Sequence, residues 1–240
     1  MWREGLTPSL HITTQADKVP WISDTSRPQH LVPDPTAGFL GGPPGRFDSA
    51  GREQLAALLE CEFTPESTVL DIGCGCLRGG RWIIPLLATG HYCGIEPNRE
   101  MLERGLRDFL DPGIAELKQP RFDHNDRFDL SVFDETFTHM IARSVWSHAA
   151  KPQIETMLDG VAKVGSEKMV FLTSFIEPSR KRRDYQGSEW VGISHESSKA
   201  GLVAHSFRWI KTVCAARGLA AELSKRPPLG GQTWIAITRA

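Results

Sequence analysis

One glycine-rich stretch of the chain, residues 69–80, combines an apolar run, an acid and closely spaced glycines in the order VLDIGCGCLRGG. Asp71 stands near the end of a predicted strand, where its carboxylate can accept hydrogen bonds from a ligand ammonium or hydroxyl group. Gly73 and Gly75 allow the backbone to approach a ligand closely, and the N-terminus of a following helix offers unpaired N–H groups. Because open α/β sheets bind ligands at the carboxyl edge of their strands, the stretch predicts a ligand site.

Two kinds of nucleotide-like ligand compete for such a loop. A dinucleotide site favours the pattern Gly-x-Gly-x-x-Gly, but Arg78 stands where the third glycine belongs and the next glycine is Gly79. S-adenosylmethionine carries an ammonium and no phosphate, so an acid at position 71 suits it better. A nicotinamide-dependent oxidoreductase stays as the alternative enzyme.

With these motifs, residues 49–240 resemble the class I S-adenosylmethionine-dependent methyltransferases. Asp71-Ile72-Gly73-Cys74-Gly75 matches the first motif of that family, and Gly94-Ile95-Glu96 matches its acidic second motif. The segment Phe137–His148 is similar to the fourth strand and the turn after it, and two late strands resemble the reversed terminal hairpin of the fold. Arg78-Gly79-Gly80 is also similar to bacterial small-molecule methyltransferases.

The resemblance implies a set of residues that bind the cofactor. Asp71 and Gly73, with Cys74 and Gly75 in the same loop, would hold its methionine end, and Glu96 would accept hydrogen bonds from the ribose hydroxyls. Asp126 would face the adenine. The remaining candidates for the methionine pocket are Arg143 and Ser144, with Arg78 or Arg52 as a partner for the cofactor carboxylate.

Methyl transfer is an in-line displacement, in which the protein mainly aligns the reactants and excludes water. If the acceptor is a hydroxyl, a nearby base would help, and histidine suits this task because its ordinary pKa lies near working pH. His148, just after the predicted fourth strand, is the first candidate, and His195 and His205 are weaker ones. The expected function is methyl transfer to a small molecule, with oxygen as the favoured acceptor atom and nitrogen or sulfur as alternatives.

A substrate cap is expected over residues 176–203, because a connection of this length in a compact domain is often a binding loop. Tyr185 and Trp190 would form its walls, with His205 at its far end, and the basic run from Arg180 to Arg183 would meet an acidic substrate.

The elements that must position these residues alternate between strands and helices. Strands are expected at Thr68–Ile72, His91–Glu96, Phe137–Ala142, Lys168–Phe175, Ala220–Leu223 and Thr233–Thr238, and helices at Ser49–Cys61, Leu77–Leu87, Asn98–Leu110, Pro152–Val164 and Ala204–Arg217. This alternation predicts an α/β, Rossmann-like, mostly parallel sheet with helices on both faces. The last two strands are joined too closely for a crossover helix, so they should pair antiparallel.

The composition indicates the domain organisation and excludes several classes of partner. Residues 1–47 are rich in proline and glycine and form an N-terminal arm, a possible lid, ahead of one domain over residues 48–240. A formal net charge of −1 argues against a general nucleic-acid binder, and the apolar runs are too short to cross a membrane. Five cysteines suit reduced thiols in a cytoplasmic protein, and Cys74 with Cys76 makes no typical zinc site. A homodimer, or a silent cofactor-binding partner subunit, remains open.

Overall fold

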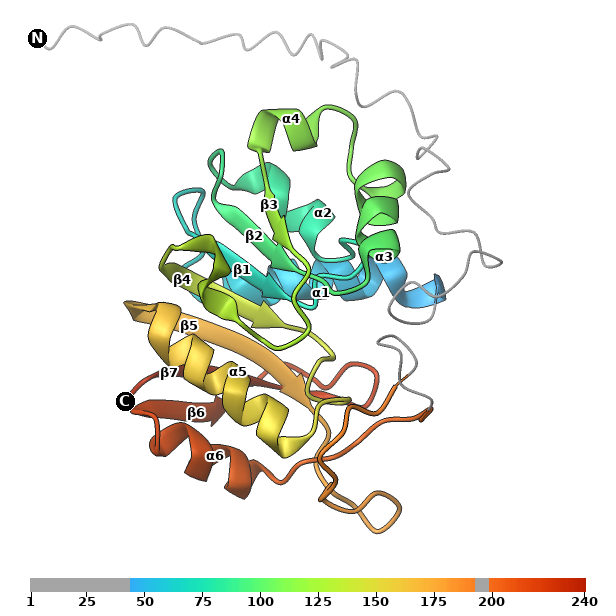
Figure 1. Cartoon of the computed structure of the whole chain (residues 1–240), viewed down its shortest axis with the longest axis vertical. Helices are drawn as coiled ribbons and strands as arrows, with labels where there is room; N and C mark the ends of the chain where they lie inside the picture. Colours follow the sequence, from blue (N-terminus) through green and yellow to red (C-terminus); the bar gives the residue numbers. More distant parts are fainter. Residues whose placement is uncertain (1–43, 193–198) are drawn as a thin grey trace, which may run out of the picture.

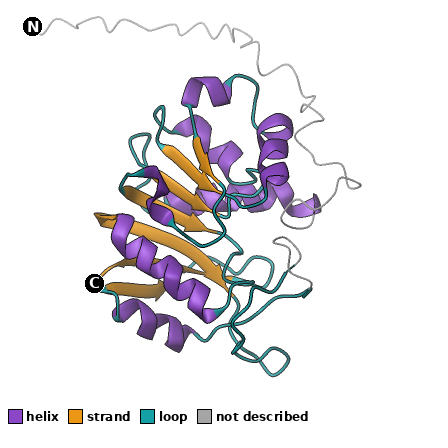
Figure 2. Cartoon of the chain, viewed as in Figure 1, coloured by secondary structure: helices purple, strands orange, loops and turns teal. Residues whose placement is uncertain are grey.

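The computed structural model describes residues 44–192 and 199–240. Within these ranges a central sheet is flanked by helices (Figures 1 and 2). The strands are β1 Val69–Ile72, β2 Tyr92–Ile95, β3 Arg121–Asp123, β4 Phe137–Ala142, β5 Gly165–Phe175, β6 Leu219–Leu223 and β7 Thr233–Arg239. The α-helices are α1 Phe47–Leu59, α2 Gly80–Ile83, α3 Arg99–Arg104, α4 Ile114–Lys118, α5 Lys151–Val164 and α6 Phe207–Ala215.

The strand order in the sheet is β3-β2-β1-β4-β5-β7-β6. Strands β1 to β5 pair in parallel, whereas β7 runs antiparallel to both β5 and β6. The expected α/β sheet with a reversed terminal strand is therefore confirmed. The carboxyl ends of β1, β2, β3 and β4 meet at one edge, which brings the glycine-rich loop beside the residues that follow the other three strands (Figure 1).

The two faces of the sheet carry separate apolar cores, because side chains alternate between faces along each strand. Leu70 and Ile72 of β1 point into the core under α5 and α6, whereas Val69 points into the core under α1 and α2. By the same alternation Asp71 lies on the α1 and α2 face. Helices on both faces are thus confirmed, and the acid and its neighbour Ile72 point to opposite sides of the sheet.

The segment after the glycine-rich loop differs from the expected helix over Leu77–Leu87. Residues 75–79 form turns, Leu77 has a φ of 58°, and α2 spans only Gly80–Ile83 before a 3-10 turn over Ile84–Leu86. A left-handed residue interrupts a helix, and Pro85 lacks an N–H, so a long regular helix cannot form here. The prediction that a helix begins at Leu77, close behind Gly75, is therefore wrong, because the helix begins at Gly80.

The other expected helices differ from the prediction only near their ends, whereas α4 over Ile114–Lys118 was not predicted. The Asn98 side chain accepts a hydrogen bond from the Met101 N–H at 3.0 Å, which confirms it as the N-cap of α3. A π-helical turn over Gly105–Phe109 continues that helix, and α6 begins at Phe207, after the Ser206 cap. Most of the expected arm lies outside the described residues, and α1 begins at Phe47.

Helix α1 packs tightly on the turn after β1. A Cβ atom at Gly51 would lie 2.1 Å from the carbonyl oxygen of Arg78. Backbone atoms cannot move aside cheaply, so the glycine sets how closely α1 approaches the site.

Gly51→Ala should therefore lower the free energy of unfolding by about 1–3 kcal/mol, because the helix must shift away from the turn. The measurement is urea denaturation of both proteins. Gly45→Ala is the matched control, because a Cβ atom there meets nothing within 4 Å. Equal stability of the two variants would contradict this packing.

Candidate functional site

The glycine-rich loop is held in place by the carboxylate of Glu96. The Gly75 N–H donates to Glu96 Oε2 at 2.9 Å, and the Asn98 N–H donates to Glu96 Oε1 at 2.9 Å. Burial raises the pKa of Glu96, while the two N–H donors lower it. The side chain predicted to bind ribose thus stands at the end of β2, fixed from both sides.

The backbone of the loop is occupied by the protein itself. The N–H groups of Gly73 and Cys74 both donate to the carbonyl of Ile95, at 2.8 and 3.1 Å. Gly73 and Gly75 have φ values of 74° and 58°, a conformation that side-chain-bearing residues rarely adopt. These two N–H groups are therefore not available to a ligand, and the loop contributes a closely approaching backbone surface instead. The Cys74 thiol is buried, and burial raises its pKa.

Asp71 lies beneath the loop, almost fully buried. The Tyr92 hydroxyl donates to Asp71 Oδ2 at 2.7 Å, while Oδ1 has no hydrogen-bond partner among the described residues. Burial raises the pKa of this carboxyl to about 7; Tyr92 opposes the shift and the nearby Glu96 charge adds to it. Such a carboxyl gains from a cation at the ligand site, because a positive charge restores its ionised form.

Arg78 supplies that region with a cation of its own. Burial and the charge of Arg143 lower the pKa of its guanidinium, while Glu53 and Asp71 act in the opposite direction. Within residues 44–192 and 199–240 it forms no ion pair and no side-chain hydrogen bond. By contrast, Arg52 is exposed and bound to Asp48 at 2.7 Å. A largely desolvated, unpaired guanidinium favours an anionic ligand group, which makes Arg78 the better carboxylate partner of the two.

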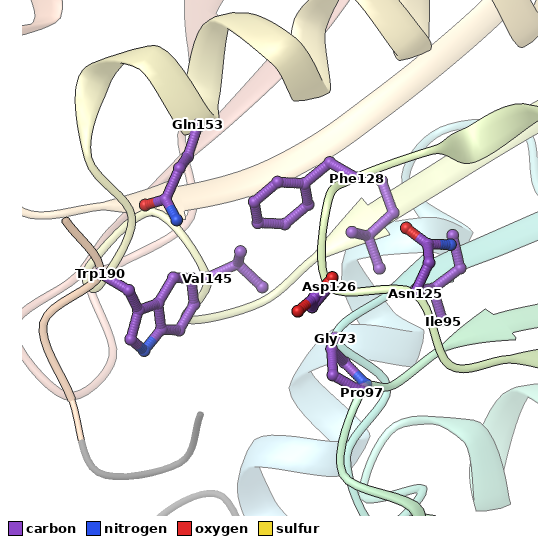
Figure 3. A pocket seen from close by; sticks show the side chains of 10 residues that line it. Gly73, Ile95, Pro97, Asn125, Asp126, Phe128, Val145, Gln153 and Trp190 are labelled. Carbon is purple, nitrogen blue, oxygen red and sulfur yellow. The ribbon is translucent and has the colours of Figure 1, made fainter. Parts of the chain in front are cut away.

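A cavity opens beside the loop at the carboxyl edge of the sheet (Figure 3). Its lining consists of Ile72, Gly73, Ile95, Pro97, Asn125, Asp126, Phe128, Val145, Gln153 and Trp190. Three of the predicted site residues, Gly73, Asp126 and Trp190, meet here from distant parts of the chain. Phe128, Val145 and Gln153 escaped the sequence analysis, since an apolar or amide residue after a strand carries no distinctive signal.

Arg143 and Ser144 lie in a polar cluster at the ends of β4, β5 and β7. The Arg143 guanidinium donates to Gln232 Oε1 at 2.7 Å and to the Leu229 carbonyl at 2.9 Å, and pairs with Glu53 at 3.3 Å. Ser144 has a φ of 65°, and its N–H donates to Ser174 Oγ at 2.9 Å. These contacts give both residues a positioning role, tying α1 to the sheet, and neither lines the cavity.

The predicted histidines are not brought together. The imidazole ring of His148 is stacked on the indole ring of Trp190, with 5.5 Å between the ring centroids. Its Nδ1 is 2.6 Å from the Val191 carbonyl oxygen. Burial lowers the pKa of His148 and of His205, whose Nε2 is 2.9 Å from the Ala149 carbonyl. Tyr185 donates to the Glu189 carbonyl at 3.0 Å and does not line the cavity. His195 lies outside the described residues.

Comparison with known proteins agrees with this arrangement. The family model for a methyltransferase domain matches residues 70–166, which run from β1 into β5. The chain therefore contains a methyltransferase domain, and its sheet has the fold of S-adenosylmethionine-dependent methyltransferases. That assignment rests on the matched motif region together with the strand order, and it sets the nicotinamide alternative aside.

Several solved structures share the fold of this methyltransferase. Magnesium protoporphyrin IX methyltransferase (ChlM) from Synechocystis PCC 6803 with bound SAM is 15% identical, with a TM-score of 0.61 over 88% of each chain. A DhpI-SAH complex is 16% identical, with a TM-score of 0.56 over 81% of this chain and 86% of the other. The mitomycin 7-O-methyltransferase MmcR is 17% identical, with a TM-score of 0.59 over 82% of this chain and 55% of the other.

Two features are absent from residues 44–192 and 199–240. No helix in this part of the methyltransferase is long and apolar enough to span a membrane. In the same residues, no group of three or more His, Cys, Asp or Glu side chains is arranged to hold a metal ion.

The buried carboxyl of Asp71 predicts a pH-dependent stability. Because its pKa is higher in the folded protein than its usual value of 3.8, the folded state binds the proton more tightly, and this contribution is lost as pH rises from about 4 to about 7. Asp71→Asn keeps the acceptor for Tyr92 without the charge. The variant should therefore gain stability relative to the wild type at about pH 8, but not at about pH 4.

Urea denaturation of both proteins at the two pH values checks this. An unchanged difference between variant and wild type would contradict the burial of a titrating carboxyl at this position. Glu222→Gln on the exposed end of β6 is the matched control and should show no such change.

Proposed function

We propose that this methyltransferase transfers the methyl group of S-adenosylmethionine to a hydroxyl oxygen of a small molecule. The observation that carries the proposal is the shared cavity. Gly73, Pro97 and Asp126 come from the loops that follow β1, β2 and β3, and Trp190 comes from the expected cap, so cofactor and acceptor can meet in one cavity (Figure 3).

The names of the structural neighbours are compatible with this proposal. One acts on a magnesium porphyrin and another on a mitomycin oxygen, so the same fold serves small-molecule acceptors of very different size. At such low identity the likeness shows the fold alone, and the acceptor of this chain must be argued from its own residues.

We assign the cofactor groups by the charge and position of the side chains around the loop. Glu96 would accept hydrogen bonds from the ribose hydroxyls, and Asp126 from the adenine amine. Arg78 would bind the methionine carboxylate, and Asp71 would stabilise the adjacent ammonium. The buried charges fit this group, because a carboxyl with a raised pKa and an unpaired guanidinium each gain a partner of opposite sign.

When bound, the cofactor supplies a methyl group on a positively charged sulfur. The protein then has to hold the acceptor in line with that group and keep water away. Ile72, Val145 and Phe128 give the cavity apolar walls that serve this purpose. The described lining contains no histidine, so we propose that an acceptor oxygen that ionises readily, such as a phenol or an enol, reacts here without a histidine base.

His148 serves a different role in this proposal. Besides its Nδ1 contact, its carbonyl accepts a hydrogen bond from the Val191 N–H at 2.9 Å, so it fastens the cap to the segment after β4. His148→Ala should weaken acceptor binding, seen as a raised KM, while the shape of the kcat–pH profile stays unchanged. Loss of the acidic limb from that profile, which protonation of a general base would produce, would contradict the role and restore His148 as the base.

The role of Arg78 gives a sharp test of the cofactor pose. Arg78→Gln should weaken binding of S-adenosylhomocysteine about tenfold to hundredfold, because a charge-assisted hydrogen bond is lost. Methylthioadenosine has no amino-acid moiety, so its affinity should change less than twofold. Calorimetric titration of both ligands makes the comparison, with the exposed Arg52→Gln as control. Equal losses for both ligands would contradict the assigned carboxylate contact.

The reaction itself is tested with methyl-labelled S-adenosylmethionine and a panel of phenols, amines and thiols. Label should pass to phenolic oxygen, and mass spectrometry of the product locates it. Glu96→Ala is the matched negative control. Transfer only to nitrogen or sulfur would overturn the choice of oxygen, and cofactor binding without any transfer would favour the silent partner subunit.

A further inference from the structure

The amide of Gln153 is a polar group of the cavity that the cofactor assignments above do not use. Gln153 lies in the first turn of α5, and its Oε1 accepts a hydrogen bond from the Ala150 N–H at 2.8 Å. A backbone N–H can only donate, so this contact fixes which end of the amide is oxygen. The Nε2 group, with two donor hydrogens, is the end left over.

No described residue accepts a hydrogen bond from Gln153 Nε2, although the side chain lines the cavity. The neighbouring amide differs in this respect. Asn125 Nδ2 donates to Asp123 Oδ1 at 2.6 Å and to the Asp129 carbonyl at 3.1 Å, and Asn125 Oδ1 accepts from the Asp129 N–H. Asn125 therefore holds its own loop together, whereas Gln153 presents donors to whatever occupies the cavity.

Gln153 also stands at the end of the cavity away from the cofactor loops. Figure 3 shows Gln153 and Trp190 on one side, with Gly73, Pro97 and Asn125 on the other. Trp190 is stacked on His148 with an interplanar angle of 19°, which fixes the orientation of its indole ring. With Val145 and Phe128, this end of the cavity combines flat apolar surface with a single amide donor.

We infer that the methyl acceptor is a flat ring compound that offers Gln153 Nε2 a hydrogen-bond acceptor other than the oxygen to be methylated, such as a ring nitrogen or a carbonyl oxygen. The inference rests on the proposed function, because it assigns this end of the cavity to the methyl acceptor. A donor-only group discriminates strongly, since a ligand without an acceptor atom would leave the amide hydrogens desolvated and unpaired.

The test begins with calorimetric titration of S-adenosylhomocysteine into the full chain, which examines the cofactor site alone. With the protein saturated by that ligand at about pH 8, hydroxyquinolines and naphthols are then titrated. The two sets share ring shape and hydroxyl group, and differ by one ring nitrogen in place of a CH group. The tightest hydroxyquinoline should bind at least about tenfold better than the tightest naphthol, a difference expected for one buried hydrogen bond.

Gln153→Glu separates this contact from a structural role. The glutamate still accepts from the Ala150 N–H and suits a helix N-terminus, but it has no amide hydrogens. The preference for hydroxyquinolines should shrink to within about twofold in Gln153→Glu and in Gln153→Met, while naphthol affinity and S-adenosylhomocysteine affinity stay within about twofold of wild type. Gln119→Glu, beyond the end of α4, is the matched charge control.

Each remaining outcome overturns a stated idea. If S-adenosylhomocysteine binds and the two ring sets bind equally, or neither binds, the assignment of Gln153 to the acceptor is wrong. If the preference survives in both variants, another group makes the contact. If the variants lose S-adenosylhomocysteine affinity in parallel, Gln153 faces the adenine instead. Failure of S-adenosylhomocysteine to bind the wild type would contradict the proposed function itself.

Discussion

The buried carboxylate of Glu96 is the interaction on which the rest of the site depends. It accepts one backbone N–H from the glycine-rich loop and one from the start of α3, so a single side chain ties together the ends of β1 and β2. Each hydrogen bond to an ionised group is stronger than a neutral one, and together they offset part of the cost of burying the charge. The loop, the N-cap of α3 and the expected ribose position therefore form one rigid unit.

A second constraint is the alternation of side chains along β1. Asp71 points toward α1 and α2 with Tyr92, while Ile72 points toward the opposite face and lines the cavity. The strand thus separates a buried electrostatic region, formed by Asp71 and Arg78, from an apolar reaction space. In water these charges would be screened, but beneath the loop their fields act strongly on a ligand that carries both an ammonium and a carboxylate.

This arrangement carries a cost in stability. Burial raises the pKa of the Asp71 carboxyl to about 7, and the largely desolvated guanidinium of Arg78 lacks a partner among the described residues. Such groups are expected where binding, and not folding, has shaped the environment. The Arg143 cluster does the opposite, because there the guanidinium is satisfied by Glu53, Gln232 and a carbonyl, and it serves to fix α1 and the segment after β4.

The sequence by itself determined the fold class, six of the seven strands of the sheet and the reversed end of that sheet, because strand periodicity and short connections are local properties. It also identified the glycine-rich loop and Glu96, whose motif is contiguous. Only the tertiary structure decided that His148 lies behind Trp190, that Arg143 is committed to Glu53 and Gln232, and that Gln153 faces the cavity. The physical reason is that these outcomes depend on contacts between residues far apart in the chain. A hydrogen bond to such a distant partner determines the orientation of a side chain and whether it can still bind a ligand.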